Sequence, residues 1–293
     1  MGRRPNLSVV GNLTIDILPT GERIPGGSPW YAGLAAAAMG CEVSVIASVG
    51  DGYPRQHIQY LERHGVKPII NFSDKPSTTY SSSWSHHKRI LRLIHPGPPI
   101  PTQMLEYIYA DAVLFSPVAG EISIQDIRSI SCKLRCVDLQ GFLRTTGEDG
   151  VVTLKRLASP SILEAAVVHA SHEEVEAATG LRSVAAAAVR LAQMGAEHLI
   201  IGLREGVLVI SREMGDWLVP SQIMGGVDAT GAGDILTGAF IANLLEIGPD
   251  LRGLAAAVAL VTDSIARPPP YRVAGTPDPL KIQKILDRAI KLD

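Results

Sequence analysis

The sequence predicts a single α/β domain over residues 1–293, with a mostly parallel central sheet flanked by helices and a small β lid. Short apolar segments alternate with helical segments along most of the chain, as in β-α-β units that pair their strands in parallel. The 293 residues are 46% hydrophobic and 19% charged, which is enough for one large core. Residues 77–94 break the alternation and predict a β-hairpin, so we place the lid near 77–95.

The first elements are a strand and a helix joined by a Gly/Pro loop. Alternating apolar and small polar residues predict a strand over 7–18. An Ala-rich helix follows over 30–39, with Ser28 as its N-cap, Pro29 in its first turn and Gly40 as its stop. Before the hairpin we expect three further elements: a strand at 42–49, a helix at 55–64 and a strand at 69–72.

The predicted hairpin carries a polar tip over 85–89. It would either cover a site or pair with a second subunit to give a homodimer, and an ordinary antiparallel edge stays open as an alternative. Helix–strand alternation resumes after the hairpin. The predicted strands are 112–115, 135–138, 166–170, 199–201 and 207–211. The predicted helices are 122–130, 162–165, 173–179, 184–194, 235–247, 251–265 and 279–292.

Composition excludes several classes of partner. The net charge is −2 and there is no basic block, so we expect no nucleic-acid partner. No apolar run reaches the roughly 18 residues that a membrane span needs, and no apolar leader follows the first residues, so we expect no membrane partner. The three cysteines are odd in number and form no C-x-x-C pair. They suit a reducing compartment, so we expect a cytoplasmic protein.

The most informative segment is 228–234, Asp-Ala-Thr-Gly-Ala-Gly-Asp, which runs into the helix predicted at 235–247. Small residues at a helix N-terminus let backbone N–H groups close on an anion, and the helix dipole adds partial positive charge there. A carboxylate such as Asp234 would repel a resting anion, but it suits a base that deprotonates a hydroxyl attacking a phosphoryl group. The segment therefore predicts an anion hole and a base. A plain tight turn is the alternative.

Segment 228–234 matches the C-terminal signature of the ribokinase-like (PfkB) carbohydrate kinases. Gly26 and Gly27, ahead of the first helix and Gly40, resemble the N-terminal signature of that family. The order of elements, the early lid and the terminal helix agree along nearly the whole chain. The resemblance implies a ribokinase-like fold and ATP-dependent phosphorylation of a hydroxyl on a small polyol, with Mg²⁺.

The resemblance also implies roles for individual residues. Asp234 would be the base, and Asp228 and Thr230 would frame the loop. N–H groups for the charge on the transferred phosphoryl group would come from Gly231, Ala232 and Gly233. Asp16 would accept hydrogen bonds from the substrate. Gly26 and Gly27 would also line the substrate site. Glu174 would order Mg²⁺-bound water, although Ser171 stands where the family carries Asn. The adenine-side loop would contain Gly202, Arg204 and Gly206, with Thr230, Gly231 and Gly233 at the phosphates.

Two observations bear on the acceptor. Tyr31 stands where the ribokinase group carries Asn, which weakens a ribose interpretation. Segment 138–144 is similar to the D-x-Q-G-F-x-R segment of archaeal and thermophile kinases assigned to myo-inositol. Gln140 can donate and accept, and Arg144 donates in a fork, which suits a ring with a hydroxyl on every carbon. We therefore expect a myo-inositol kinase, unless 140–144 is only a strand-end turn.

Other functions stay open. A kinase for another sugar or for a nucleoside is the nearest alternative, and the aromatic slot that a nucleoside base needs could come from Trp30, Tyr31 and Trp84. A ligand-binding protein that has lost catalysis is a further alternative. The carboxylate of Asp234 beside the glycines argues against it, because anion binding alone has no use for a negative charge there.

Overall fold

The computed structural model describes residues 3–85, 88–106, 108–221, 228–273 and 275–292. A ten-stranded sheet forms the centre of the molecule, in the order β16-β15-β14-β13-β12-β9-β8-β1-β4-β5. Its parallel strands are β1 (Asn6–Val10), β4 (Glu42–Asp51), β5 (Val66–Pro76), β8 (Ala112–Phe115), β9 (Leu134–Asp138), β12 (Val167–Ser171) and β13 (His198–Gly202). Antiparallel pairing adds β14 (Gly206–Ser211), β15 (Trp217–Pro220) and β16 (Ile290–Lys291) at one edge.

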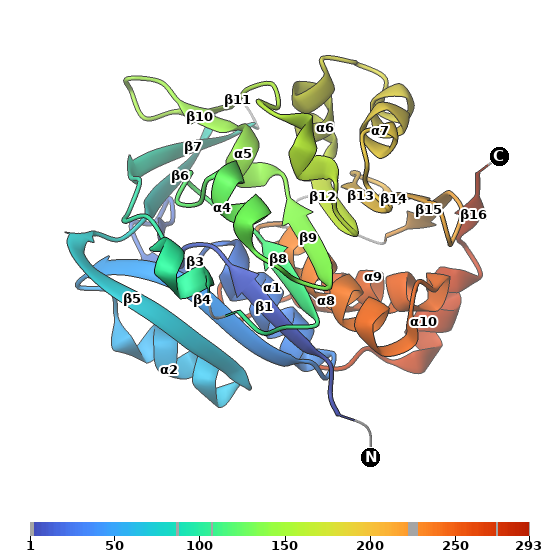
Figure 1. Cartoon of the computed structure of the whole chain (residues 1–293), viewed down its shortest axis with the longest axis horizontal. Coiled ribbons are helices and arrows are strands. Elements are labelled where there is room, and N and C mark those ends of the chain that lie inside the picture. Colours follow the sequence, from blue (N-terminus) through green and yellow to red (C-terminus); the bar gives the residue numbers. More distant parts are fainter. Residues whose placement is uncertain (1–2, 86–87, 107, 222–227, 274, 293) are drawn as a thin grey trace.

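Helices cover both faces of this sheet (Figure 1). One face packs against α1 (Ser28–Ala38), α2 (Arg55–Arg63), α8 (Ala232–Ile247) and α9 (Leu251–Ile265), with α10 (Pro279–Leu286) outside α9. The other face packs against α3 (Thr102–Leu105), α4 (Ile124–Ser129), η1 (Pro160–Leu163), α6 (His172–Thr179) and α7 (Val184–Gln193). Alternation along β1 shows why: Leu7 and Val9 enter the first core and Val10 the second.

Helices α1 and α8 approach each other closely at a glycine. A methyl group added to Gly238 would lie 2.2 Å from the carbonyl oxygen of Ala32, so only glycine allows this approach. Ala32 lies in the N-terminal half of α1, and Gly238 lies in the N-terminal half of α8. The close approach therefore brings the N-terminal halves of the two helices together on the same side of the sheet.

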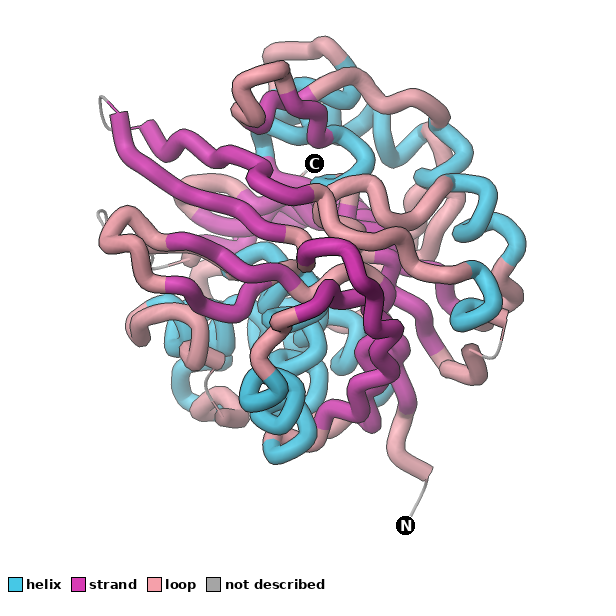
Figure 2. The backbone as a smooth tube through the Cα atoms, turned by 90° about the vertical axis from the view of Figure 1, so that its left-hand side faces the viewer, coloured by secondary structure: helices cyan, strands magenta, loops and turns pink. Residues whose placement is uncertain are grey.

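The predicted lid is larger than a hairpin. Strands β6 (Thr79–Ser85) and β7 (Lys88–His95) form the predicted antiparallel hairpin, whose tip residues 86–87 lie outside the described residues. They continue a four-stranded sheet with β2 (Thr14–Ile17) and β3 (Arg23–Gly26), in the order β3-β2-β6-β7. Figure 2 shows this hairpin as the two long magenta strands that extend away from the helices.

The strand predicted over 7–18 is wrong as a single element, because it divides into β1 in the main sheet and β2 in the lid. The break has a packing cause. A side chain on Gly11 would meet the carbonyl oxygen of Ser116 at 2.3 Å. The next residue, Asn12, is fully buried, and its amide donates to Thr78 and Pro98 and accepts from the N–H of Ser48. Asn12 therefore fixes the crossing between the two sheets.

Several predicted elements need correction. The terminal helix predicted over 279–292 ends with α10 at Leu286, and the chain then pairs with β15 as β16. Ser28 is not the N-cap of α1, because Gly27 holds that position and makes no side-chain cap. The short strands β10 (Arg144–Thr146) and β11 (Val152–Leu154) were not predicted, and neither was β15. Helix α9 has its predicted bounds, and α8 begins three residues before the predicted start.

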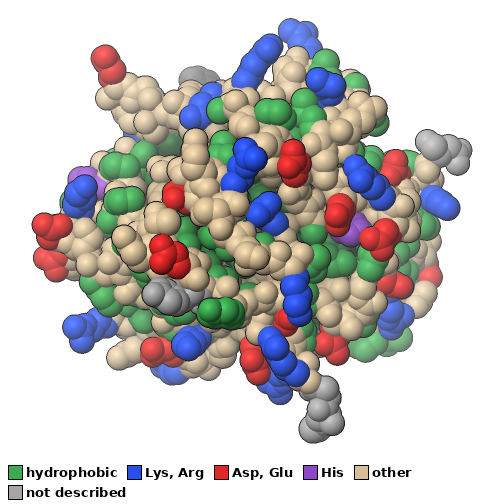
Figure 3. Space-filling model, viewed as in Figure 1, with side chains coloured by type: hydrophobic (Ala, Val, Ile, Leu, Met, Phe, Trp, Pro, Cys, Tyr) green, Lys and Arg blue, Asp and Glu red, His purple; other side chains and the backbone are tan. Residues whose placement is uncertain are grey.

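The surface matches the mixed composition. On the face shown in Figure 3, basic and acidic side chains are interspersed rather than gathered by sign. Within the described ranges, no helix is both long enough and apolar enough to span a membrane.

Candidate active site

A cavity lies where the carboxyl ends of the main-sheet strands face the lid. Its walls come from both sheets, from the start of α1 and from the loop that leads into α8. It brings together nine of the residues predicted to form the site: Asp16, Gly27, Gln140, Arg144, Glu174, Thr230, Gly231, Gly233 and Asp234. Ligands of open α/β folds bind at this end of the strands.

A second, mostly apolar cavity adjoins the first at Gly233, which lines both. It contains three more predicted residues, Gly202, Gly206 and Ala232, and its apolar wall is made by Leu236, Val258 and Val261. Three predicted residues line neither cavity: Arg204, Gly26 and Asp228, whose place in the loop before α8 is described below. Arg204 is exposed. Gly26 lies behind Asp16, where a methyl group would meet the carboxylate at 2.3 Å, so this glycine makes room for an acid.

The loop before α8 leaves backbone donors free at the helix N-terminus. Gly231 is the N-cap with φ +80°, and a methyl group there would lie 2.6 Å from the ring of Tyr31. Within the described part of the chain, the N–H groups of Gly231, Gly233 and Asp234 have no acceptor. Ala232 differs from the prediction, because its N–H donates to the carbonyl of Ala229 at 3.0 Å. The free N–H groups and the helix dipole suit an anion.

A buried arginine holds this loop in shape. Arg272 is 1% exposed, and its Nη1 donates to the carbonyl oxygens of Asp228 and Thr230, each at 2.8 Å. Asp228 Oδ1 accepts from the N–H of Thr230 at 2.9 Å and from its hydroxyl at 2.6 Å. Burial alone would raise the pKa of Asp228, but these bonds and the charge of Arg272 outweigh it and lower the pKa. Asp228 and Thr230 thus hold the turn through their mutual hydrogen bonds.

Asp234 stands in the first turn of α8, beside the free N–H groups. Burial, together with the nearby carboxylate of Asp138, raises the pKa of Asp234 to about 6. A hydrogen bond from the hydroxyl of Ser28 opposes that rise, and so do the charges of His169 and Arg144. A carboxylate with a pKa near neutrality can accept a proton from a hydroxyl far better than an ordinary aspartate.

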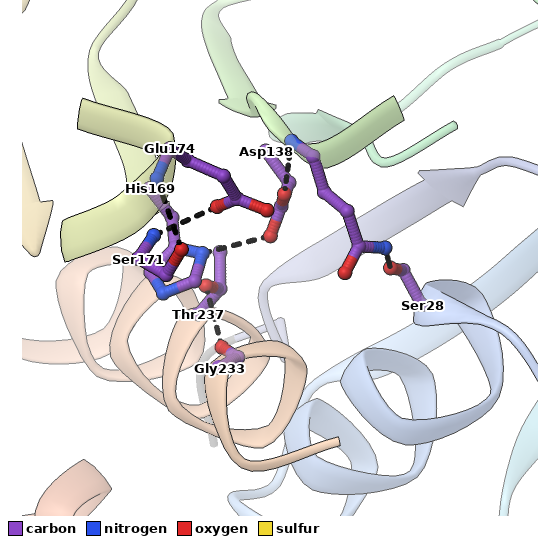
Figure 4. Close-up of polar contacts among 8 residues, drawn as sticks. Ser28, Asp138, His169, Ser171, Glu174, Gly233 and Thr237 are labelled. Carbon is purple, nitrogen blue, oxygen red and sulfur yellow. Dashed lines mark hydrogen bonds and ion pairs between the residues drawn. The ribbon is translucent and has the colours of Figure 1, made fainter. Parts of the chain in front are cut away.

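The Ser28 hydroxyl belongs to the site and not to a helix cap. Its Oγ accepts from Nε2 of Gln140 at 3.1 Å, and Ser28 is 1% exposed (Figure 4). Gln140 begins the short helix α5 (Gln140–Leu143), directly after β9. Its amide carbonyl remains available to accept from a ligand, since the amide group carries both functions.

On the lid side, two groups of opposite charge face the cavity. Asp16 in β2 accepts from the hydroxyl of Thr14 at 2.7 Å. Burial raises the pKa of Asp16, against the effects of Thr14, Arg89 and Arg144. The guanidinium of Arg144 lies 5.5 Å from the centre of the Tyr80 ring, which holds it over the cavity. The site therefore offers both acceptors and donors to a ligand.

Glu174 is buried, with 8% of its surface exposed. A Glu that only stabilised the first turn of a helix could stay exposed, and Glu174 does not. Its Oε2 accepts the N–H of Ser171 at 2.7 Å, while the Ser171 hydroxyl accepts the N–H of Glu174. This capping box holds the carboxylate at the cavity wall. Burial and the charge of Asp138 raise the pKa of Glu174. In the described residues, no group of three or more His, Cys, Asp or Glu side chains could hold a metal ion.

Sequence reasoning missed the pair formed by Asp138 and His169. Asp138 ends β9, His169 lies beside it in β12, and the two residues are register partners. His169 Nδ1 lies 2.8 Å from Asp138 Oδ2, and both side chains are buried (Figure 4). Segment 138–144 was singled out for Gln140 and Arg144 alone. A histidine inside the apolar run of β12 was the signal that could have found its partner.

Comparison with known proteins places these features in a family. A family model described as pfkB family carbohydrate kinase matches residues 114–263, just over half of the chain. The chain is 26% identical over 256 residues to the cytidine kinase of Thermococcus kodakarensis, with 81% of this chain and 88% of the relative covered. It is 24% identical over 255 residues to the aminoimidazole riboside kinase of Salmonella typhimurium, with 80% of each covered.

A solved structure agrees with the fold. A pyrophosphate-dependent kinase in the ribokinase family, complexed with a pyrophosphate analogue and myo-inositol, matches with a TM-score of 0.81 at 18% identity, over 95% of this chain and 100% of the other. This match confirms the predicted ribokinase-like fold. The kinase relatives and the family model both indicate phosphoryl transfer to a hydroxyl group. The chain therefore belongs to the pfkB family of carbohydrate kinases.

Proposed function

We propose that this kinase transfers the γ-phosphoryl group of ATP to one hydroxyl of a small ring polyol, with myo-inositol as the first candidate. One observation carries the proposal: Asp234, with its pKa raised to about 6, stands beside free N–H groups at the start of α8. An anion loop binds phosphate without a carboxylate. The carboxylate adds the one function that transfer to a hydroxyl needs, a base.

The proposed step uses residues of both sheets. Asp16, Gln140 and Arg144 orient the polyol so that one hydroxyl meets Asp234. The hydroxyl oxygen bonds to the γ-phosphorus as its proton passes to Asp234, and the bond to the leaving diphosphate oxygen breaks. The free N–H groups of Gly231 and Gly233 receive the negative charge on the transferred oxygens.

The apolar cavity supports a nucleotide donor. Leu236, Val258 and Val261 offer apolar surface on which a base could pack, and Gly202 and Gly206 add lining without side chains. Mg²⁺ would be held mainly by phosphate oxygens and water, as is usual for this ion, with Glu174 ordering the water. Within the described ranges no group of three or more candidate ligands gathers, which fits an ion held mainly by phosphate oxygens. The ion would neutralise charge on the phosphates.

The acceptor is tested by turnover with a panel of myo-inositol, ribose, cytidine and adenosine, each with ATP or pyrophosphate and Mg²⁺. We expect the highest kcat/KM with myo-inositol and ATP. In Gln140→Ala this kcat/KM should fall about 10-fold or more, because a hydroxyl of the bound polyol then lacks its hydrogen-bond partner. Preference for another acceptor would discard myo-inositol and keep the kinase assignment. No turnover with any pair would overturn the proposal.

A nucleoside is the second candidate, and one observation favours it. A further cavity continues from the first past Asp16 and Tyr80 to Trp84, an exposed aromatic side chain on the lid. A base attached to a sugar could stack there, whereas inositol has no group to reach it. Trp84→Ala separates the two readings: it should raise KM for a nucleoside acceptor and leave KM for myo-inositol unchanged.

The raised pKa of Asp234 predicts a pH dependence. The base works only when deprotonated, so kcat at saturating substrates should fall as the pH drops through about 6. An aspartate with its usual pKa would keep full activity to about pH 4–5. The measurement is a kcat profile from acid to neutral pH, with far-UV circular dichroism at each pH as the control for folding. A profile that stays flat down to pH 5 would contradict the assignment of Asp234.

A further inference from the structure

His169 is buried at the seam between the two cavities, with one ring nitrogen unpartnered. Its side chain is 7% exposed, and within the described residues Nε2 has no hydrogen-bond partner. A methyl group added to Gly233 would lie 3.1 Å from Nε2, and one added to Gly202 would lie 4.0 Å from it. Gly233 lines both cavities and Gly202 lines the apolar one. Nε2 thus lies against these two glycines, at the wall where the two cavities meet.

The partner on the other ring nitrogen fixes what Nε2 can do. Asp138 accepts at Nδ1, so Nδ1 carries a hydrogen, and Nε2 becomes a donor only when the ring is a cation. Three carboxylates face the ring from separate elements: Asp138 in β9, Glu174 in α6 and Asp234 in α8. Burial lowers the pKa of His169, but these charges outweigh it and raise the pKa.

Among the described residues, positive side chains line only one of the two cavities. The cavity that faces the lid is lined by Arg89 and Arg144, whereas the lining of the apolar cavity includes no Lys or Arg. A polyphosphate that runs from the apolar cavity to Asp234 passes Nε2. A buried donor without an acceptor costs free energy, and a phosphate oxygen would satisfy it.

We propose that His169, protonated at Nε2 and held by Asp138, donates a hydrogen bond to the polyphosphate chain of the phosphoryl donor. The proposal rests on the proposed function, because it needs a phosphoryl donor bound where the two cavities meet. His169 is then a donor-binding residue, and Asp138 is a positioning residue that keeps Nε2 directed at the phosphates and favours the charged ring. ATP and pyrophosphate share the chemistry that Nε2 recognises.

The test is calorimetric titration without an acceptor, on either side of neutral pH. The probes are β,γ-imido-ATP with MgCl₂ and, in a separate arm, pyrophosphate with MgCl₂. In His169→Asn the amide stays near Nδ1 and keeps its bond to Asp138, but the group at Nε2 is gone. We expect about 10- to 100-fold weaker binding below neutral pH, the usual effect of one charged hydrogen bond. We also expect donor affinity to fall less steeply with rising pH in His169→Asn than in the wild type, because only the ionisation of Asp234 and Glu174 then remains.

His198→Asn is the matched control. His198 is also buried, lies on the neighbouring strand β13, and has its Nδ1 2.8 Å from the hydroxyl of Ser211. It lines neither cavity, so its replacement should leave donor affinity and its pH dependence as in the wild type. His169→Gln, which returns a neutral N–H near the Nε2 position, should recover part of the affinity and none of the pH dependence.

The outcomes separate this inference from the function on which it rests. Equal affinity and equal pH dependence in wild type and His169→Asn would overturn the role of His169 and leave the kinase proposal intact. Failure of the wild type to bind either probe would overturn both. Binding of only one probe, with the expected loss in His169→Asn, supports the inference and identifies whether the polyphosphate comes from a nucleotide or from pyrophosphate.

Discussion

Asp234→Asn should lower kcat by about 10²- to 10⁴-fold, the usual contribution of a positioned general base. The amide keeps the shape of the side chain and can still contact the hydroxyl of Ser28, but it cannot accept the proton of the acceptor. The measurement is coupled turnover at saturating acceptor and donor. Donor affinity should fall little, because the N–H groups of the loop remain in place.

Stability provides the control for this variant. The folded-state pKa of Asp234 lies near 6, above the unfolded value of 3.8, so the folded state favours the protonated form. That stabilisation is full below the unfolded pKa and is lost as the pH rises through about 6. At neutral pH the ionised carboxylate no longer adds stability, and Asp234→Asn should melt at the wild-type temperature or above it. Unchanged kcat in a folded variant would remove Asp234 from the mechanism.

Gly231→Ala should lower kcat/KM by about 10²-fold or more, as expected when an anion-stabilising donor is displaced. Two penalties act together. The residue has φ +80°, which costs a side chain of order 1–3 kcal/mol, and the new methyl group would lie 2.6 Å from the ring of Tyr31. Either the ring or the loop must move, and both line the cavity.

Gly248→Ala is the matched control for Gly231→Ala. Gly248 caps the other end of the same helix with φ +79°, and a methyl group there would meet nothing within 4 Å. It carries the conformational penalty without the clash. Both variants should lose thermal stability, because each places a side chain at positive φ, and only Gly231→Ala should lose activity. Equal kinetic losses in the two variants would show that the effect is a general weakening of α8 rather than damage to the anion loop.

The parts of the site that could be predicted are local in sequence. Segment 228–234 encodes its own turn, its helix start and its carboxylate, so the location of Asp234 followed from neighbouring residues alone. The helix bounds of α9 and the hairpin β6–β7 were predicted for the same reason, because their patterns are complete within a short window.

What could not be predicted depends on contacts between distant segments. The bond between His169 and Asp138 joins residues 31 positions apart, and no local pattern shows that β9 and β12 are neighbours. The division of segment 7–18 depends on what surrounds Gly11 and Asn12, which strands from elsewhere supply. Ala232 was assigned a free N–H because a sequence does not reveal that Ala229 already accepts it.

The crossing at Asn12 has a consequence for whether the phosphoryl group is transferred to the polyol or to water. Asp16 belongs to the lid sheet, while Asp234 and the anion loop belong to the main sheet and its helices. Under the proposed function, only a polyol large enough to touch both can align its hydroxyl with the base. A water molecule at Asp234 would lack the several hydroxyl groups by which a polyol is oriented on the lid side. Separating acceptor recognition from the base in this way would suppress wasteful hydrolysis of the donor.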